Sequence, residues 1–274
     1  MKIIKLMIIV LVAVLGFSSC SKESDSNKEK KLVKIYCEKK SNDKKYLYSN
    51  WTFEYNEEEQ LVSAYNEIFS GEEDYIIGTY KYTWYKEAID VVSDIKIKMS
   101  FVEDEEVTQN QKYTLILKDG RFSYGLGLGE EESTKSIYSY TSNGKMQNYK
   151  DIASDFICVW DGDKLIEVNN NDPVLRTDYK FTYGNISCVK GFALNAILTT
   201  QQAEHLSYVH PELAGIRTSQ CPILEKITYY DGEQITDSTT YEYSYEFDEE
   251  GYMTKMIGIV IDKEETIDYA LTWE

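Results

Sequence analysis

Apolar and polar residues alternate along most of the chain, most clearly between residues 241 and 256. The aromatic residues at every second position from Tyr241 to Phe247 fall on one face of an extended strand. Asp248–Gly251 supplies turn chemistry, because carboxylates bond their own backbone and glycine accepts a positive φ. Alternation resumes at Tyr252–Met256, so this stretch predicts a β-hairpin.

The same unit recurs at intervals of about 20 to 25 residues, the spacing of a repeated supersecondary element. Asn143-Gly144 and Asp161-Gly162 are strong hairpin signals, and Gly184-Asn185 is interpreted as a turn of the same kind. One hairpin cannot bury its own face, so the hairpins should stack side by side. We predict an all-β fold, a large antiparallel up-and-down meander that is curled or closed into a barrel-like sheet. The sequence does not decide whether the sheet closes into a barrel, because inner and outer positions alternate identically in a closed barrel and in an open curled sheet.

The predicted strands share this alternation or a short β-rich run. They cover residues 32–38, 46–55, 61–65, 76–85, 89–102, 113–117, 138–140, 146–149, 157–160, 165–168, 181–183, 186–189, 223–230, 239–247, 252–261 and 267–273.

One segment interrupts the alternation. Asn195–Leu206 places its apolar residues at near-helical spacing, which predicts one short helix near 195–206. An irregular loop should follow as far as Cys221-Pro222. The position of this insertion among strands suggests a plug, a lid or a strut.

The N-terminal residues predict an export signal. Lys2 and Lys5 precede an apolar run, Leu6–Phe17, that is shorter than the roughly 20 residues a membrane-spanning helix needs. Ser-Ser-Cys20 follows and resembles the lipobox of bacterial lipoproteins, although Phe17 replaces the usual leucine. We predict a signal peptide over 1–19 and acyl chains on Cys20 that hold the protein on a lipid bilayer.

The residues after the lipidation site predict a tether. Residues 21–31 include no apolar side chain, so they cannot form a core, and 20–31 should be a lipidated cysteine with a disordered polar spacer. Glu23 and Asp25 resemble, in diluted form, the acidic residues of surface-displayed lipoproteins. The expected location is the outer membrane, on its periplasmic or cell-surface face. Residues 32–274 should form a single β-meander domain.

Charge excludes some partners. Without the signal peptide the chain has 27 basic and 47 acidic residues, a net charge near −20. Nucleic acid and anionic lipid surfaces would repel such a protein. The sequence therefore predicts no nucleic-acid partner.

Cys37, Cys158, Cys188 and Cys221 remain after Cys20. Export permits disulfides, and four cysteines allow three pairings, but buried free thiols are an equal alternative. No C-x-x-C spacing occurs, so a structural zinc site is not expected.

Catalytic chemistry has little support. His205 and His210 are five residues apart, a spacing that does not bring two ligands onto one helix face. No Gly-x-Ser-x-Gly elbow accompanies them, and the acidic turns do not follow the ordered calcium-loop pattern. We expect no metal, no cofactor and no enzymatic activity.

Aromatic residues give the one binding hypothesis. Trp51, Trp84 and Trp160 could present flat rings to a sugar, or they could pack against neighbouring side chains of the sheet. Packing is the default interpretation for cross-strand aromatic residues.

The C-terminal repeats resemble a known family. Cys221–Tyr229, the run Tyr-Glu-Tyr-Ser-Tyr-Glu-Phe ending at Phe247, and Asp248–Met256 are similar to Bacteroidetes lipoproteins with a domain of unknown function described as porin-like. The resemblance extends over most of residues 32–274 and implies an antiparallel meander of many strands. It implies no site residues, because the family has no assigned activity.

These observations lead to three functional hypotheses. The first is a membrane-anchored, non-catalytic module that binds a glycan or another extracellular ligand. The alternative is a structural or accessory subunit of an outer-membrane protein assembly, with a protein partner. The third is a hydrolase that uses loop carboxylates, although nothing in the sequence selects a pair of them.

Overall fold

Strand formation follows the alternation of side chains. The computed structural model describes residues 29–42, 44–70, 74–99, 103–129, 135–151, 155–171, 176–188, 201–261 and 263–274. The chain divides into two units, 1–31 and 32–274, and the strands belong to the second. Cys20 and the signal segment lie outside the described residues.

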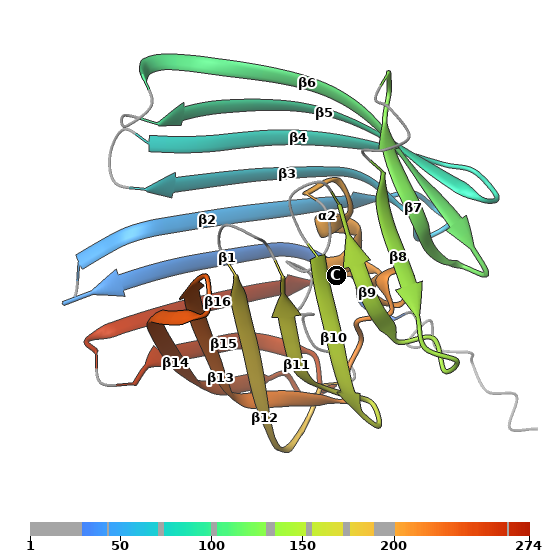
Figure 1. Cartoon of the computed structure of the whole chain (residues 1–274). Coiled ribbons are helices and arrows are strands. Elements are labelled where there is room, and N and C mark those ends of the chain that lie inside the picture. The colour runs from blue at the N-terminus through green and yellow to red at the C-terminus, as the bar shows by residue number, and fades with distance from the viewer. Residues whose placement is uncertain are drawn as a thin grey trace, which may run out of the picture. The chain divides into compact units, whose positions relative to one another are not determined.

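The described residues of the second unit form sixteen strands and two short helices (Figure 1). The strands are β1 (Leu32–Ser41), β2 (Lys44–Tyr55), β3 (Leu61–Ser70), β4 (Asp74–Trp84), β5 (Ala88–Met99), β6 (Glu103–Lys118), β7 (Arg121–Gly127), β8 (Ser136–Tyr140), β9 (Met146–Lys150), β10 (Asp155–Asp161), β11 (Lys164–Asn170), β12 (Thr177–Ser187), β13 (Gln220–Asp231), β14 (Gln234–Phe247), β15 (Met253–Val260) and β16 (Glu265–Trp273). The helices are α2 (Gln201–Val209) and α3 (Pro211–Ala214).

The meander is closed into a barrel. Each strand pairs antiparallel with its neighbours in sequence, and β1 pairs with β16 to complete the circle. Ile35 lies opposite Leu271, and Cys37 lies opposite Tyr269, across this closing pair. The predicted antiparallel up-and-down barrel is confirmed, and the open question of closure is resolved.

Inner and outer faces differ sharply in polarity. On β5, Ile89, Val91 and Ile95 are buried, whereas Asp94 and Lys96 are exposed. Antiparallel pairing places partners on the same face, so the buried residues of all strands form one apolar interior. The outer face carries charged residues together with exposed apolar ones such as Val92, Ile137 and Ile259.

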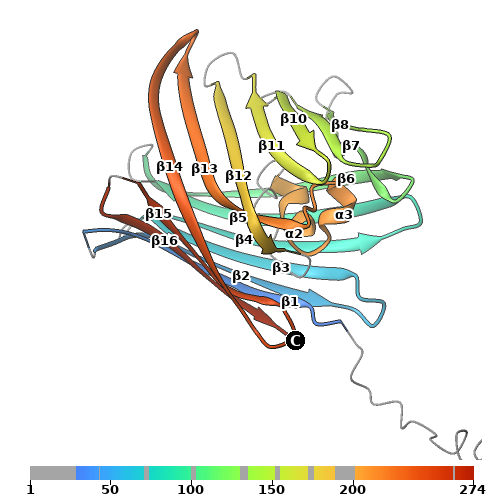
Figure 2. The same cartoon turned by 90° about the horizontal axis from the view of Figure 1, so that it is seen from below.

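The two ends of the barrel have different character. Tight turns at residues 56–60, 85–87, 119–120, 141–145, 162–163 and 248–252 form one end, here named the turn rim. The opposite end is named the open rim. There the strands end at different heights, and β13 and β14 extend past β10 and β11 (Figure 2).

Aromatic side chains fasten the turn rim. Residues at the ends of even-numbered strands donate hydrogen bonds to backbone carbonyls at the starts of the preceding strands. These bonds are Tyr55 Oη to Leu32 O (2.7 Å), Trp84 Nε1 to Leu61 O (2.8 Å), Trp160 Nε1 to Met146 O (2.7 Å), Tyr183 Oη to Leu165 O (2.8 Å), Tyr245 Oη to Pro222 O (2.5 Å) and Trp273 Nε1 to Met253 O (2.7 Å). These six bonds give a role to the aromatic residues that recur near the ends of the even-numbered strands β2, β4, β10, β12, β14 and β16.

Two strand predictions were wrong. Gly184-Asn185 is no turn, since β12 continues to Ser187 and accommodates the extra residues as a shift in its register with β13. Gly184 is needed because a Cβ there would lie 3.0 Å from Cγ2 of Ile223. β7 was not predicted; its Gly125 leaves space for the ring of Tyr113.

The predicted helix is present with shifted bounds. α2 runs three residues beyond Leu206, to Val209, and the predicted start at 195–200 lies outside the described residues. The loop that should follow contains α3, which begins at Pro211 and is closed by Gly215 at φ 67°. No helix among the described residues is long and apolar enough to cross a membrane.

The helix is a plug inside the barrel (Figures 1 and 2). His205, at 0 % exposure, packs on the rings of Tyr80 (4.2 Å between centroids) and Phe53 (6.4 Å). Tyr208 meets Trp51 edge-on at 6.2 Å. Of the three roles suggested by the sequence, the structure therefore selects the plug.

Candidate functional site

An acidic side chain faces the interior on β13. Glu225 lies in register between Phe181 of β12 and Tyr241 of β14, both of which point inward. The hydroxyl of Tyr243 donates a hydrogen bond to its Oε2 atom. Among the described residues Oε1 has no hydrogen-bond partner, so this oxygen is available to a ligand.

A ladder of aromatic rings lies beside Glu225. Tyr241 and Tyr243 stack with centroids 6.0 Å apart and planes 10° apart, and Tyr245 and Phe247 continue the row at 6.4 Å intervals. Their predicted placement on one strand face is confirmed. The opposing Gly258 gives Tyr243 its space, because a Cβ there would lie 2.8 Å from the Tyr243 ring.

The plug contributes a second carboxylate. Glu204 of α2 accepts a hydrogen bond from Tyr208 (2.7 Å to Oε1), and its Oε2 has no partner among the described residues. Tyr269 hydrogen-bonds the Cys37 thiol, and both lie close enough to Tyr208 to affect it electrostatically. The set that links the two carboxylates is named the tyrosine–carboxylate wall and comprises Cys37, Glu204, Tyr208, Glu225, Tyr241, Tyr243 and Tyr269.

Part of the wall is reached by solvent, although Cys37, Tyr208 and Tyr243 are buried. Glu204, Glu225, Tyr241 and Tyr269 are only half-buried although they point into a closed barrel. Because these side chains point inward, part of the interior beside the plug is accessible to solvent.

Burial sets the electrostatics of the wall. It raises the pKa of Glu225, against the opposing effects of the Tyr243 hydrogen bond and the Lys39 charge. It also raises the pKa of Glu204, which the Tyr208 hydrogen bond opposes. Burial and the neighbouring Tyr229 raise the pKa of Tyr241 to about 12. A ligand that donated hydrogen bonds to the carboxylates would offset their lost hydration.

Polar atoms under the plug lack partners. Within the part of the chain that the structure describes, neither ring nitrogen of His205 has a hydrogen bond, nor do Ser93 Oγ, the Tyr82 hydroxyl and Asn66 Oδ1, all of which are buried. Burial lowers the pKa of His205 to about 3, so the ring is neutral. Internal water is the usual partner for such groups.

The three predicted tryptophans are not brought together. Trp51 packs on Tyr208 with 9 % of its surface exposed, whereas Trp84 and Trp160 donate to carbonyls at the turn rim. No ring contact among the described residues joins any two of them. These positions agree with the packing alternative, and a ligand-binding role stays a prediction.

The remaining predicted groups are placed as follows. All four cysteines, Cys37, Cys158, Cys188 and Cys221, are free and buried. His210 Nδ1 lies 3.3 Å from Glu212 Oε1. Among the described residues no group of three or more potential ligands could hold a metal ion.

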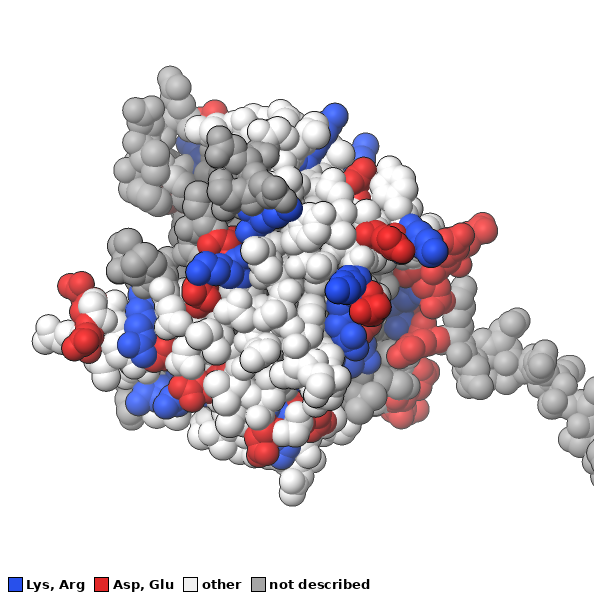
Figure 3. All heavy atoms as spheres, turned by 45° about the vertical axis from the view of Figure 1, so that its right-hand side comes forward, with Lys and Arg blue, Asp and Glu red and all other residues white. Residues whose placement is uncertain are grey.

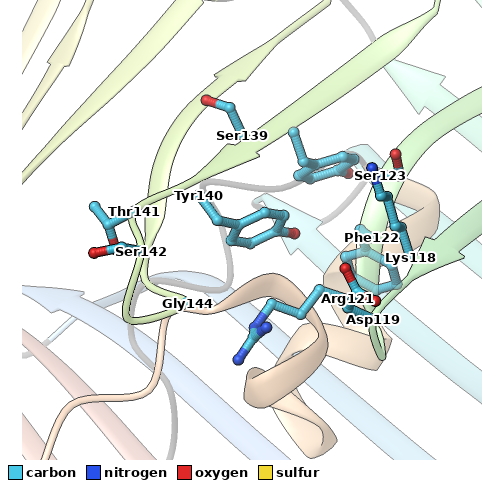
Figure 4. A pocket seen from close by; sticks show the side chains of 11 residues that line it. Lys118, Asp119, Arg121, Phe122, Ser123, Ser139, Tyr140, Thr141, Ser142 and Gly144 are labelled. Carbon is cyan, nitrogen blue, oxygen red and sulfur yellow. The ribbon is translucent and has the colours of Figure 1, made fainter.

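A separate pocket lies near the turn rim, between the β6–β7 and β8–β9 turns (Figure 4). It measures about 380 Å³ and is lined by Lys118, Arg121 and Tyr140 among others. The Arg121 guanidinium already lies over the Tyr140 ring at 5.9 Å. Basic side chains elsewhere on this side occur in small groups among acidic ones (Figure 3), so no basic surface suited to nucleic acid is seen on that face.

Sequence reasoning missed both carboxylates of the wall. A signal for Glu225 existed, because it occupies the same strand face as Ile227 and Tyr229, where an acidic residue is unexpected. Glu204 could not be located, since its surroundings depend on where the plug docks.

Comparison of this chain with known proteins shows similarity to solved structures and none to family models or curated sequences. No family model matches the chain, and no curated protein sequence matches it. A crystal structure of a porin-like protein from Bacteroides uniformis ATCC 8492 matches with a TM-score of 0.59 and 14 % identity, over 89 % of this chain and 98 % of that one. The barrel has the porin-like fold. A second porin-like protein, from Bacteroides vulgatus ATCC 8482, matches with a TM-score of 0.56 and 13 % identity, over 90 % and 99 % of the two chains. The similarity to porin-like structures agrees with the family resemblance noted in the sequence.

Proposed function

We propose that this protein is an exported, lipid-anchored binding protein whose barrel interior takes a sugar or short glycan at the tyrosine–carboxylate wall. One observation carries the proposal: Glu225 and Glu204 face an accessible interior, and each keeps one oxygen without a partner among the described residues. A solid core would have no reason to retain two half-buried carboxylates.

The chemistry of the wall suits sugars. Aromatic rings offer apolar faces to the C–H faces of a pyranose, and carboxylates accept hydrogen bonds from its hydroxyl groups. Tyr208 and Tyr243 hold the carboxylates in place through hydrogen bonds, so little side-chain ordering is left for the ligand to impose. We propose binding without catalysis, with both carboxylates acting as hydrogen-bond acceptors for the ligand.

The outer surface supports a position beside the bilayer and not within it. Lys81, Asp94 and Lys96 are exposed on the outward face of β4 and β5. Barrels that span membranes turn an apolar band outward, and a lysine at mid-bilayer depth costs about 2–4 kcal/mol. Attachment to the outer membrane would therefore depend on acyl chains at Cys20.

The test is calorimetry and thermal unfolding of the purified mature protein with a glycan panel. Glu225→Gln should weaken binding, whereas Glu242→Gln should not, because Glu242 lies on the outer face of β14, one residue from Tyr241. A ligand at 100 times its Kd should raise stability by about 2.7 kcal/mol. Equal binding by both variants would exclude the wall as the site, and cleavage of the glycan would favour a hydrolase.

A second candidate function has one observation in its favour. β6 pairs with β5 along its length, but among the described pairings it joins β7 only from Tyr113 onward, so residues 103–110 have no described strand on their other side (Figure 1). An unpaired edge can accept a strand from another protein. An accessory subunit would use this edge of β6 to bind its partner. Thr108→Pro should then abolish capture of the partner from outer-membrane extracts, whereas Glu225→Gln should leave capture intact.

A further inference from the structure

The junction between the plug segment and the barrel brings two cysteines together. β12 ends at Ser187, which pairs with Gln220 at the start of β13. One residue further, the Cys188 N–H donates to Ser219 O at 2.8 Å. The Cys221 thiol lies 3.9 Å from Ser187 O, and the Cys188 side chain is close enough to raise the pKa of the Cys221 thiol.

The other two cysteines have different neighbours. Cys37 on β1 contacts Tyr269 and Ser49 on the flanking strands. Cys158 on β10 lies opposite Val168 of β11. Among the described residues, Cys188 and Cys221 are therefore the pair that the fold presents to each other.

We propose that Cys188 and Cys221 form a disulfide that ties both ends of segment 189–220 to the barrel wall. The segment carries α2 and α3, so the bond would fix the plug at its point of entry and exit. Each thiol loses a proton, the two sulfur atoms join, and two electrons pass to the disulfide of a thiol–disulfide oxidant, which becomes a dithiol. Such oxidants act on exported proteins.

The bond must form before folding is complete. In the folded barrel Cys188 is 9 % exposed and Cys221 is fully buried, so an oxidant cannot reach them. The same burial should protect the finished disulfide from reductants in solution. The link would limit excursions of a segment that places Glu204 and His205 in the interior. This inference does not depend on the proposed ligand.

The experiment maps thiols in the full exported protein. Denatured, unreduced protein is labelled with one alkylating reagent and, after reduction, with an isotopically heavier one. Peptides with Cys37 and Cys158 should carry the first label, and those with Cys188 and Cys221 the second. First-label modification of all four would overturn the proposal.

Variants establish the pairing and its effect. Cys188→Ala should move Cys221 to the first label, whereas Cys158→Ala, the matched buried control, should leave Cys188 and Cys221 on the second. If Cys188 carried the first label in the Cys158→Ala variant, the pairing of Cys188 with Cys221 would be overturned. Denaturing reduction followed by refolding should lower the Tm of the wild type by several degrees and leave a Cys188→Ala/Cys221→Ala double variant unchanged. An unchanged wild-type Tm would overturn the role as a tie.

Discussion

Tyr243 and Glu225 are hydrogen-bonded across the inner faces of β14 and β13, with the tyrosine as donor. The bond holds one carboxylate oxygen and leaves the other facing the accessible interior. A buried carboxylate is costly, so its presence on an otherwise aromatic wall calls for a partner from outside the chain.

The first prediction concerns Glu225 and pH. Burial raises its folded-state pKa above the ordinary value of 4.5, so the folded protein holds this proton more tightly than the unfolded chain. Stability should therefore fall as pH rises from about 4.5 through the folded pKa. Glu225→Gln removes this loss, so the variant should be more stable than the wild type at pH 8 and equal to it near pH 4.

The measurement is urea denaturation between pH 4 and 8, followed by ligand titration at pH 7. The same variant should lose ligand affinity about tenfold or more, since a charge-assisted hydrogen bond is removed. Higher stability together with weaker binding identifies a binding group. Unchanged stability across the pH range would contradict the burial of Glu225.

The second prediction concerns His205. Its folded pKa of about 3 lies below the ordinary 6.5, so the unfolded chain binds more protons between these values and stability falls as pH drops below about 6.5. At pH 5 the loss should be about 2 kcal/mol. His205→Leu abolishes this titration and also removes two buried nitrogens without partners. Guanidinium denaturation at pH 5 and pH 8 measures the free energy of unfolding of the wild type and of His205→Leu. The same pH dependence in both proteins would contradict the prediction.

The sequence was sufficient for most strands, though not for β7, because the contrast between solvent and core imposes a period of two. The aromatic ladder illustrates this: Tyr241, Tyr243 and Tyr245 pack against the core and the residues between them are polar, while Phe247 at the strand end is exposed. Closure was undetermined, since the β1–β16 pairing depends on strand number and stagger. The turn prediction at Gly184-Asn185 was wrong because a glycine beside an asparagine is compatible with a turn and also with the close approach of another side chain. Here the side chain of Ile223 approaches Gly184 within the strand pair.

The site was harder to predict than the fold. The tryptophans were the only ligand-binding candidates in the sequence, with packing as the default interpretation, and Trp84 and Trp160 have backbone carbonyls as partners at the turn rim. Such bonds join residues 23 and 14 positions apart, and no local pattern specifies them. The inward position of the Glu204 carboxylate likewise becomes evident only once α2 is placed inside the barrel.

The third prediction concerns the anchor. Cys20→Ser should remove the acyl chains and shift the protein from the membrane fraction to the soluble fraction, because the outer face of the barrel is charged. Fractionation with labelled fatty acid measures both effects. Ser21→Ala is the matched control and should stay in the membrane fraction. Retention of Cys20→Ser on membranes would contradict anchoring by lipid.

The fourth prediction separates the structural and ligand-binding roles of the tryptophans. Trp84→Phe and Trp160→Phe each remove an indole donor from a carbonyl at the turn rim, which should cost about 1–3 kcal/mol. The two losses should add, because the residues lie on different hairpins. Trp51→Phe is the matched control: it removes ring area against Tyr208 without a described indole hydrogen bond. Chemical denaturation followed by circular dichroism supplies the values. If Trp84→Phe and Trp160→Phe lost ligand affinity at full stability, the rings would be ligand-binding surfaces and their role at the turn rim would be secondary.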